Sequence, residues 1–275
     1  MKNTNNLITE LLIRTQGTDV SKYDTTFLNK SLQKRMAEAF CLSDDEYCKF
    51  LEENRKEGTR FVESLQISYS EFFRNPLTFA VLERIILPSL KLKKTSAKRK
   101  EIRIWSAACA AGQEAYSLAI LLEEQKNYNS ESFKFRIFAT DQSEVLLSEA
   151  RKGEFNAFAL NNVNLKRIKE CFDKNAKTFK IKPNLKENID FSVFDLLNKD
   201  YICPPSSIFG DFDLVVCANL LFYYKPEYRE IILEKVSNSM VNNGFLITGE
   251  AEREIFLNAG FREVYPYSAI FQKNK

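Results

Sequence analysis

The stretch 102-IRIWSAACAAGQEAYSLAILL-122 joins a short apolar run, a turn of small residues and a long apolar helical pattern. Such a succession predicts a buried strand, a tight turn and a helix. Turns of this kind hold ligands in many α/β proteins. The turn has a single glycine, Gly112, and no Lys-Ser or Lys-Thr pair follows it, so it does not fit a phosphate-binding loop.

Short apolar runs alternate with helical patterns from residue 101 onward. The predicted strands are 102–107, 135–140, 189–194, 212–219 and 244–249, and the predicted helices are 112–125, 142–152 and 225–240. This alternation predicts an α/β fold with a doubly wound, mostly parallel sheet. Residues 261–273 predict two antiparallel strands that meet at Tyr265-Pro266-Tyr267, and a small β-containing excursion is expected at about 172–188.

The chain before residue 100 shows no strand-like alternation. Helical spacing runs through residues 25–64, where Ser43 opens a Ser-x-x-Glu capping box. A further helix is predicted from near Pro76 to about Pro88. We therefore expect a helical N-terminal domain (1–90), a basic linker (91–100) and a catalytic domain (101–275).

The composition is that of an ordinary soluble protein, with 44% hydrophobic and 28% charged residues in 275. No apolar run is long enough to span a bilayer, and the start lacks a secretory pattern, so we expect a cytoplasmic protein without membrane insertion. The six scattered cysteines predict reduced thiols and no metal site.

Histidine is absent from the chain. Its absence argues against hydrolases of the triad type and against most metalloenzymes, because histidine is the commonest general base and metal ligand. A reaction whose nucleophile is already ionised at neutral pH would suit this chain.

The basic residues are unevenly spread, although the formal net charge is only +3. Residues 91–103 hold seven basic residues against one acid, and residues 164–186 are also strongly basic. These segments are either solvated surface or a docking face for an acidic partner. They lack interleaved aromatic residues, so nucleic acid is not an expected partner.

A nucleoside cofactor is the ligand that the turn predicts. The second predicted strand ends in Asp141, 29 residues beyond Gly112, and an acid at that place can accept hydrogen bonds from ribose hydroxyls. The alternative for Asp141 is a helix cap. A dinucleotide usually requires a fuller glycine pattern, so S-adenosylmethionine fits better than a dinucleotide.

The chain resembles the CheR-type chemotaxis methyltransferases, in which receptor glutamates are esterified with S-adenosylmethionine. An ordered series of motifs carries the resemblance from about residue 25 to residue 272: 68-SYSEFFRNP-76, 104-IWSAACAAGQEAYSLAI-120, 139-ATDQSEVLLSEARKGEF-155, 191-FSVFDLL-197, 213-DLVVCANLLFYY-224 and 243-NGFLITGEAE-252. The resemblance implies a methyltransferase fold with S-adenosylhomocysteine as product.

The resemblance also implies which residues hold the cofactor. Arg74 would bind the methionine carboxylate, because guanidinium pairs with carboxylates bidentately. Glu114 would meet the cofactor amino group, and Asp141 the ribose. The other implied cofactor positions are Ser68, Ser70, Gly112, Asp195, Leu196, Ala218 and Asn219. Ser68, Ser70 and Ala218 depart from the family's usual asparagine, threonine and arginine, and Asp195 stands where the family usually has asparagine.

Tyr223 and Arg74 are the residues that the resemblance places nearest the chemistry, with Tyr223 shaping the acceptor pocket. The alternative for Tyr223 is that 220-LLFYY-224 is aromatic core. Lys30, Lys34 and Arg35 form a basic stripe that either contacts the substrate helix or is a solvated face.

The implied function is methyl transfer to glutamate carboxylates of chemoreceptors, whose glutamate-rich cytoplasmic helices would be the partners. We expect a monomer. Some family members dock on a peptide at the receptor C-terminus through glycine-rich turns, whereas 171-CFDKNAKTFKIKPN-184 has no glycine, so we predict independence from such a tether. The alternatives are another protein or small-molecule acceptor, or an S-adenosylmethionine-binding module without catalysis.

Overall fold

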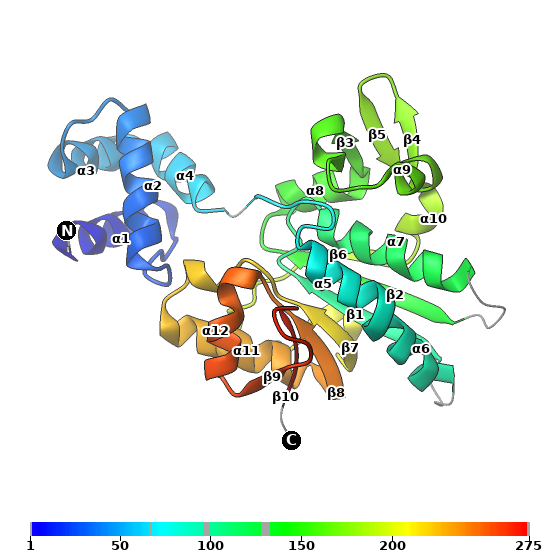
Figure 1. Ribbon diagram of the computed structural model, residues 1–275. Coiled ribbons are helices and arrows are strands. Elements are labelled where there is room, and N and C mark those ends of the chain that lie inside the picture. The colour runs from blue at the N-terminus through cyan, green and yellow to red at the C-terminus, as the bar shows by residue number, and fades with distance from the viewer. Residues whose placement is uncertain (1, 67, 96–99, 128–132, 274–275) are drawn as a thin grey trace. The chain divides into compact units, whose positions relative to one another are not determined.

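A computed structural model describes residues 2–66, 68–95, 100–127 and 133–273 (Figure 1). The chain forms two compact units. The helical unit comprises Met1–Ile67 and Leu220–Ile231, and the sheet unit comprises Ser68–Asn219 and Ile232–Lys275. The first division therefore falls at residue 67, whereas we expected a boundary near residue 90.

The helical unit has four helices near its start: α1 (Lys2–Gln16), α2 (Thr25–Glu38), α3 (Asp44–Glu53) and α4 (Arg55–Ser64). The predicted helical character of residues 25–64 is confirmed. α1 lies within the expected helical N-terminal domain, although no helix was specified for its residues. Ser43 caps α3 by accepting a hydrogen bond from Glu46 N at 3.2 Å. The Glu46 carboxylate accepts a hydrogen bond from Leu42 N at 2.7 Å. In an ideal capping box the donor would be the N–H of Ser43, one residue later.

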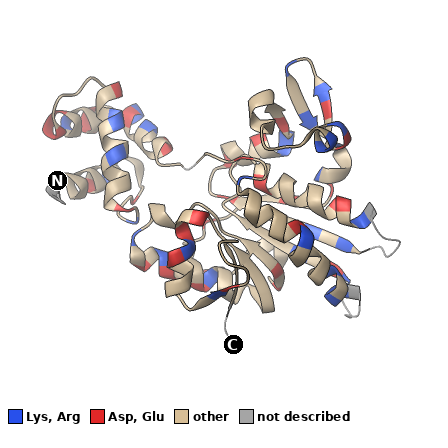
Figure 2. Cartoon of the chain, viewed as in Figure 1, with Lys and Arg blue, Asp and Glu red and all other residues tan. Residues whose placement is uncertain are grey.

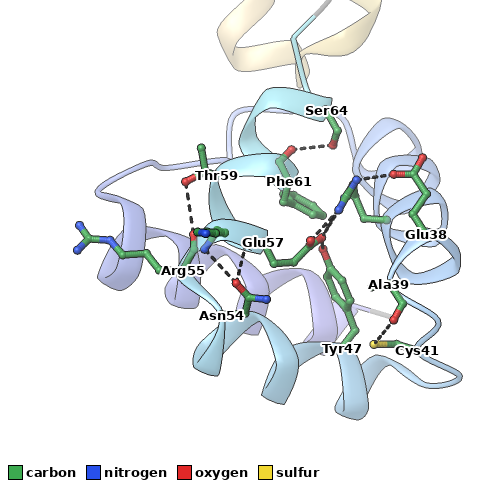
Figure 3. Close-up of polar contacts among 12 residues, drawn as sticks. Glu38, Ala39, Cys41, Tyr47, Asn54, Arg55, Glu57, Thr59, Phe61 and Ser64 are labelled. Carbon is green, nitrogen blue, oxygen red and sulfur yellow. Dashed lines mark hydrogen bonds and ion pairs between the residues drawn. The ribbon is translucent and has the colours of Figure 1, made fainter.

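A buried carboxylate holds the helical unit together (Figure 3). Glu57 in α4 is 1% exposed, and Arg35 in α2 binds it through Nε and Nη2 at 2.9 and 2.6 Å. The Tyr47 hydroxyl of α3 donates to the same carboxylate at 2.8 Å, so three helices meet at one group. Burial alone would lower the pKa of Arg35, but its bonds to Glu57 outweigh this and raise it.

The basic stripe predicted on α2 is therefore only partly a surface feature. Arg35 is committed to Glu57 and also pairs with Glu38 on the next turn of the helix. Lys30 and Lys34 are exposed. An external acidic partner would meet these two lysines, and Arg35 is a structural residue.

The sheet unit is built on seven strands in the order β6-β2-β1-β7-β8-β10-β9 (Figure 1). Their bounds are β1 (Glu101–Ala107), β2 (Lys134–Asp141), β6 (Ile189–Val193), β7 (Phe212–Val216), β8 (Met240–Ile247), β9 (Phe261–Glu263) and β10 (Ile270–Lys273). β1 pairs in parallel with β2 and β7, whereas β10 is antiparallel to β8 and β9. The predicted mostly parallel α/β sheet is confirmed.

Helices cover both faces of this sheet. The connecting helices of the sheet unit are α7 (Gln113–Asn127), α8 (Glu144–Lys152), α12 (Arg253–Asn258) and, from Ile232 onward, α11 (Pro226–Asn238), with one-turn helices η3 (Pro205–Ser207) and η5 (Glu250–Glu252). The one-turn helix η4 (Leu221–Tyr223) and the start of α11 belong to the helical unit. Ile102 and Ile104 of β1 face the core shared with α7. Trp105 points the other way and packs against Phe212, as alternation along a strand requires.

The helix predicted from Pro76 to Pro88 continues beyond its expected end. It comprises α5 (Pro76–Val81), a π-helical turn η1 (Leu82–Ile86) and α6 (Leu87–Thr95). Proline lacks an N–H and clashes with the preceding turn of an α-helix. The wider π turn lies just before Pro88 and lets the helix pass it. Residues 91–95, predicted as linker, are therefore helical, and 96–99 lie outside the described residues.

The excursion between β2 and β6 is a small three-stranded antiparallel sheet in the order β3-β5-β4. Its elements are β3 (Glu154–Asn156), η2 (Ala157–Leu160), α9 (Leu165–Cys171), β4 (Phe172–Asn175), β5 (Thr178–Ile181) and α10 (Pro183–Lys186). Figure 2 shows basic residues on this small sheet, where Lys174 lies on β4 and Lys180 on β5. Arg167 is not available to a partner, because it binds Glu124 at 2.7 Å and Glu83 at 3.0 Å.

All six cysteines are free thiols, as the sequence predicted. Cys109 and Cys217 are almost completely buried, at 1% and 0% exposure. Burial raises the pKa of both thiols well above the ordinary value, and nearby carboxylates add to the rise.

We predict that Arg35→Met lowers the free energy of unfolding by about 3–5 kcal/mol, because it leaves the buried Glu57 carboxylate without its cation. Lys34→Met on the same helix is the control, and it should change stability by about 0.5 kcal/mol or less. Urea unfolding followed by circular dichroism measures both. Equal effects of the two substitutions would contradict the structural role of Arg35.

Candidate cofactor site

The candidate site lies at the carboxyl end of β1, where the strand order reverses. β1 has β2 on one side and β7 on the other, so the connections leave the sheet in opposite directions from this point. Ligands of open α/β sheets bind in the crevice that such a reversal creates. The turn at residues 108–112 occupies this place.

The turn has an unusual backbone. Ala108, Ala110 and Gly112 all have positive φ, at 65°, 48° and 88°. A Cβ at Gly112 would lie 2.9 Å from the Ala150 Cβ and 3.3 Å from the Phe191 ring, so both the conformation and the space require glycine. The turn also donates a hydrogen bond from Cys109 N to Thr140 O at 2.8 Å, which ties it to β2.

Asp141 ends β2 and is 9% exposed. Its Oδ2 accepts a hydrogen bond from Ala110 N, and its Oδ1 one from Ser143 N, both at 2.9 Å. Burial raises the pKa of Asp141, while these backbone N–H groups oppose the rise. A carboxylate has about four acceptor positions. Asp141 can therefore fix the turn and still accept hydrogen bonds from ribose hydroxyls. It is not the helix cap of the alternative interpretation, because Ser143 caps α8.

Arg74 is placed by two buried phenylalanines. Phe72 is 0% exposed and packs against Phe155, while Phe73 packs against Phe79. Phe73 has a positive φ of 49°, and its N–H donates to Ser117 Oγ of α7 at 3.1 Å. The next residue, Arg74, is half-buried, and its guanidinium lies 5.0 Å from the centre of the Tyr69 ring. Among the described residues Arg74 forms no ion pair, so it can accept an external carboxylate.

Glu114 lies in the first turn of α7, immediately after Gly112 and Gln113. Its Oε1 accepts a hydrogen bond from Ser106 Oγ of β1 at 2.6 Å. Loss of water raises the pKa of Glu114 to about 7, although Ser106 and the charge of Arg74 oppose the rise and the charge of Glu252 adds to it. A cation that bound here would bring Glu114 back to its ionised form.

Arg74 and Glu114 together suit the amino-acid end of S-adenosylmethionine. That end carries a carboxylate and an ammonium group, which complement a guanidinium and a glutamate. The two side chains interact electrostatically, and they come from different segments of the sheet unit. Of the two serines in the same motif as Arg74, Ser68 is exposed and Ser70 is half-buried.

Asp195 and Leu196 follow β6 in the sheet unit. Leu196 is 4% exposed, and Asp195 Oδ1 accepts from Leu197 N at 2.9 Å. This bond shapes the turn after β6, while Asp195 itself stays partly accessible. An adenine amine could donate to the remaining acceptor positions of this carboxylate.

Ala218 and Asn219 follow β7, the other strand at the reversal of strand order, and both are partly exposed. Asn219 has a positive φ of 59°, and its N–H donates to Glu252 Oε2 at 2.6 Å. Sequence reasoning did not select Glu252 or Ser106 as site residues. The role of Glu252 depends on β7 and β8 being neighbours, and that of Ser106 on how the turn after β1 brings Glu114 back to the strand. The sequence alone shows neither.

Tyr223 belongs to the helical unit, whereas every other predicted site residue belongs to the sheet unit. Its ring packs edge-on against Phe27 of α2 at 4.7 Å between centroids, and its carbonyl accepts from Asp24 N at 2.8 Å. The neighbouring Tyr224 is 2% exposed and stacks on Tyr23. The segment 220–224 is thus partly aromatic core, as the alternative interpretation held.

A family model described as "CheR methyltransferase, SAM binding domain" matches residues 68–264. The chain belongs to this CheR family. A chemotaxis protein methyltransferase of Listeria innocua is 29% identical over 245 residues, which cover 89% of this chain and 88% of that protein. A chemotaxis protein methyltransferase of Borreliella burgdorferi is 30% identical over 232 residues, and the match covers 83% of this chain and 79% of that protein.

S-adenosylmethionine is the cofactor of this CheR family member, and the unpaired Arg74 guanidinium, Glu114 and Asp141 fit it. No group of three or more histidine, cysteine, aspartate or glutamate side chains suited to a metal ion occurs within the described ranges. In those same ranges, no helix is both long and apolar enough to cross a membrane.

We predict that Arg74→Ala weakens binding of S-adenosylhomocysteine by about 1–3 kcal/mol, because a charge-assisted hydrogen bond to the carboxylate is lost. Titration calorimetry measures the effect. Arg84→Ala removes an exposed arginine of η1 and serves as the control, with unchanged affinity expected. Wild-type affinity in Arg74→Ala would show that this arginine does not hold the ligand.

We predict that the affinity for S-adenosylhomocysteine rises with pH between about 5.5 and 7. Glu114 has a pKa of about 7 in the free protein and must lose its proton to pair with the ligand ammonium. Well below that pKa the affinity should fall by about tenfold for each pH unit. Calorimetry across this range tests the slope. Glu114→Gln should bind more weakly with a flat profile, and an equally steep profile in that variant would contradict the assignment.

Proposed function

We propose that this protein transfers the methyl group of S-adenosylmethionine to glutamate side chains of chemoreceptors and forms methyl esters. The observation that carries the proposal is the alignment with chemotaxis protein methyltransferases over most of both chains. The charge arrangement at the carboxyl end of β1 supports it independently, since Arg74 and Glu114 match an amino-acid ligand. Cofactor binding at Ser68, Ser70, Asp195, Leu196, Ala218 and Asn219 is part of this proposal.

The proposed reaction needs no general base. S-adenosylmethionine supplies an electrophilic sulfonium methyl group when bound. The acceptor glutamate has an ordinary pKa of about 4.3, so it is ionised at neutral pH and attacks as it stands. A carboxylate oxygen–carbon bond forms, the carbon–sulfur bond breaks, and its electron pair stays on sulfur, so no proton moves. A chain without histidine can perform this chemistry.

The protein's own contribution is alignment and exclusion of water. In the proposal Arg74 and Glu114 hold the amino-acid end of the ligand, and Asp141 holds the ribose. Three fixed points restrict the direction of the methyl group. We propose that Tyr223 shapes the place where the acceptor carboxylate loses its water, because desolvation makes a carboxylate more reactive.

Receptor binding is proposed to begin at the exposed Lys30 and Lys34 of α2. Their charges complement a glutamate-rich helix. Exposed charges of this kind chiefly raise the rate at which two proteins associate. The excursion is proposed to work without a receptor-tail tether. Its β4–β5 connection is Ala176-Lys177, and Ala176 adopts a positive φ of 48° where a glycine would be the ordinary choice.

The decisive experiment incubates the protein with tritiated S-adenosylmethionine and membranes enriched in chemoreceptors. We expect label on the receptor that mild base releases as methanol, since methyl esters hydrolyse under those conditions. Tyr223→Phe should reduce transfer while leaving the affinity for S-adenosylhomocysteine unchanged. Base-stable label would indicate nitrogen or carbon acceptors, a reading that the departures at Ser68 and Ala218 keep open. Binding without transfer would favour a module without catalysis.

The tether-free part of the proposal has a separate test. Receptors that lack their last residues should be methylated at the same rate as intact receptors. A matching tail peptide should not be retained by the immobilised protein. Micromolar binding of that peptide would contradict independence from a tether and would leave the methyl transfer itself intact.

A further inference from the structure

Glu252 is a buried carboxylate that the methyl-transfer chemistry does not use. It ends η5, shortly after β8, and is 0% exposed. One of its oxygens, Oε2, accepts three hydrogen bonds: from Asn219 N at 2.6 Å, Thr248 Oγ1 at 3.0 Å and Gly249 N at 3.2 Å. β7 and β8 are parallel neighbours, so this oxygen joins the chain segments that follow two adjacent strands.

Asn219 is held from a second side by Gly249. Asn219 has a positive φ of 59°, a conformation that asparagine adopts more readily than most residues with a side chain. A Cβ on Gly249 would lie 2.8 Å from Asn219 Oδ1 and 2.9 Å from its Cγ. The Asn219 side chain therefore occupies the space that a side chain at residue 249 would need. The Glu252 oxygen fixes the Asn219 backbone, and the bare Gly249 backbone leaves room for its side chain.

Burying a carboxylate to connect two loops costs free energy, because the charge loses its contacts with water. Well-packed apolar side chains often stabilise a fold as well as buried charges do, so a buried charge calls for another explanation. Asn219 supplies that explanation, because it is one of the proposed cofactor contacts. We propose that Glu252 is a positioning residue, which fixes the Asn219 backbone and so the shape of the cofactor site beside β7.

This inference rests on the proposed function, since it concerns the same cofactor site. It adds an electrostatic consequence. The groups that influence Glu114 are Ser106 on β1, Arg74 ahead of α5, and Glu252 on η5. Buried Cys109 and Cys217 are also close enough to interact electrostatically with Glu114, but their raised pKa keeps them neutral near pH 7. Glu252 adds a negative charge that raises the pKa of Glu114, so its removal should lower that pKa.

The test compares the wild type with four variants by calorimetry with S-adenosylhomocysteine between pH 5.5 and 8, and each protein is checked by urea unfolding. Glu252→Met removes the acceptor, and its affinity at pH 8 should fall about tenfold or more. Gly249→Ala keeps the carboxylate but displaces Asn219, and the backbone at φ −75° tolerates alanine, so a similar fall is expected. Thr248→Val loses one bond to the same oxygen and leaves Asn219 untouched; it should lose stability and keep its affinity.

Glu252→Gln separates position from charge. Its amide oxygen can take the place of Oε2, so the affinity at pH 8 should stay within about threefold of wild type. The pH at which binding reaches its plateau should move lower, because Glu114 loses a negative neighbour. If Glu252 had only a structural role, the four substitutions would change the urea midpoint of unfolding without changing the affinity for S-adenosylhomocysteine or this pH profile.

The outcomes separate the two proposals. Failure of the wild-type protein to bind S-adenosylhomocysteine would overturn the proposed cofactor site itself. Wild-type binding together with affinities within about twofold in folded Glu252→Met and Gly249→Ala would overturn the positioning role and leave the proposed function standing. If Glu252→Met does not fold, Gly249→Ala and the pH profile of Glu252→Gln decide the question.

Discussion

The hydrogen bond from Ala110 N–H to the Asp141 carboxylate is the constraint on which the candidate site depends. It fixes the turn after β1 against the end of β2, and it does so with the oxygen of a residue that also suits a ribose. The turn needs this support because three of its residues have positive φ and two of those are alanines. One buried carboxylate therefore holds the strained backbone and presents acceptors to a ligand.

The same design recurs at other places in the molecule. Glu57 gathers three helices of the helical unit, and Glu252 joins the segments after β7 and β8. Each is almost fully buried, and each accepts several donors at once. Glu114 differs from them, because in the part of the chain that the structure describes it accepts a hydrogen bond only from Ser106, and burial raises its pKa to about 7. An incompletely satisfied carboxylate is a poor element of the fold and a suitable receptor for a cation.

The sequence predicted the sheet well, since β1 and β2 are buried apolar runs and their bounds shifted by only about one residue at either end. It specified no helix at α1, although the expected helical N-terminal domain includes these residues, because the polar start 2-KNTNN-6 carries no clear helical period. It also ended a helix at Pro88, which a π turn allows the chain to pass. Motif resemblance selected Arg74 and Glu114. No local pattern could link Glu252 to Asn219, because these two residues become neighbours only when β8 lies beside β7.

The buried cysteines have a consequence for an enzyme that handles an alkylating cofactor. A thiolate is a stronger nucleophile toward a sulfonium than a carboxylate is, and Cys109 sits in the turn itself. Its 1% exposure and raised pKa keep the sulfur protonated and out of reach. A buried and protonated thiol is a poor target for alkylation, so a cysteine is compatible with a place in this turn.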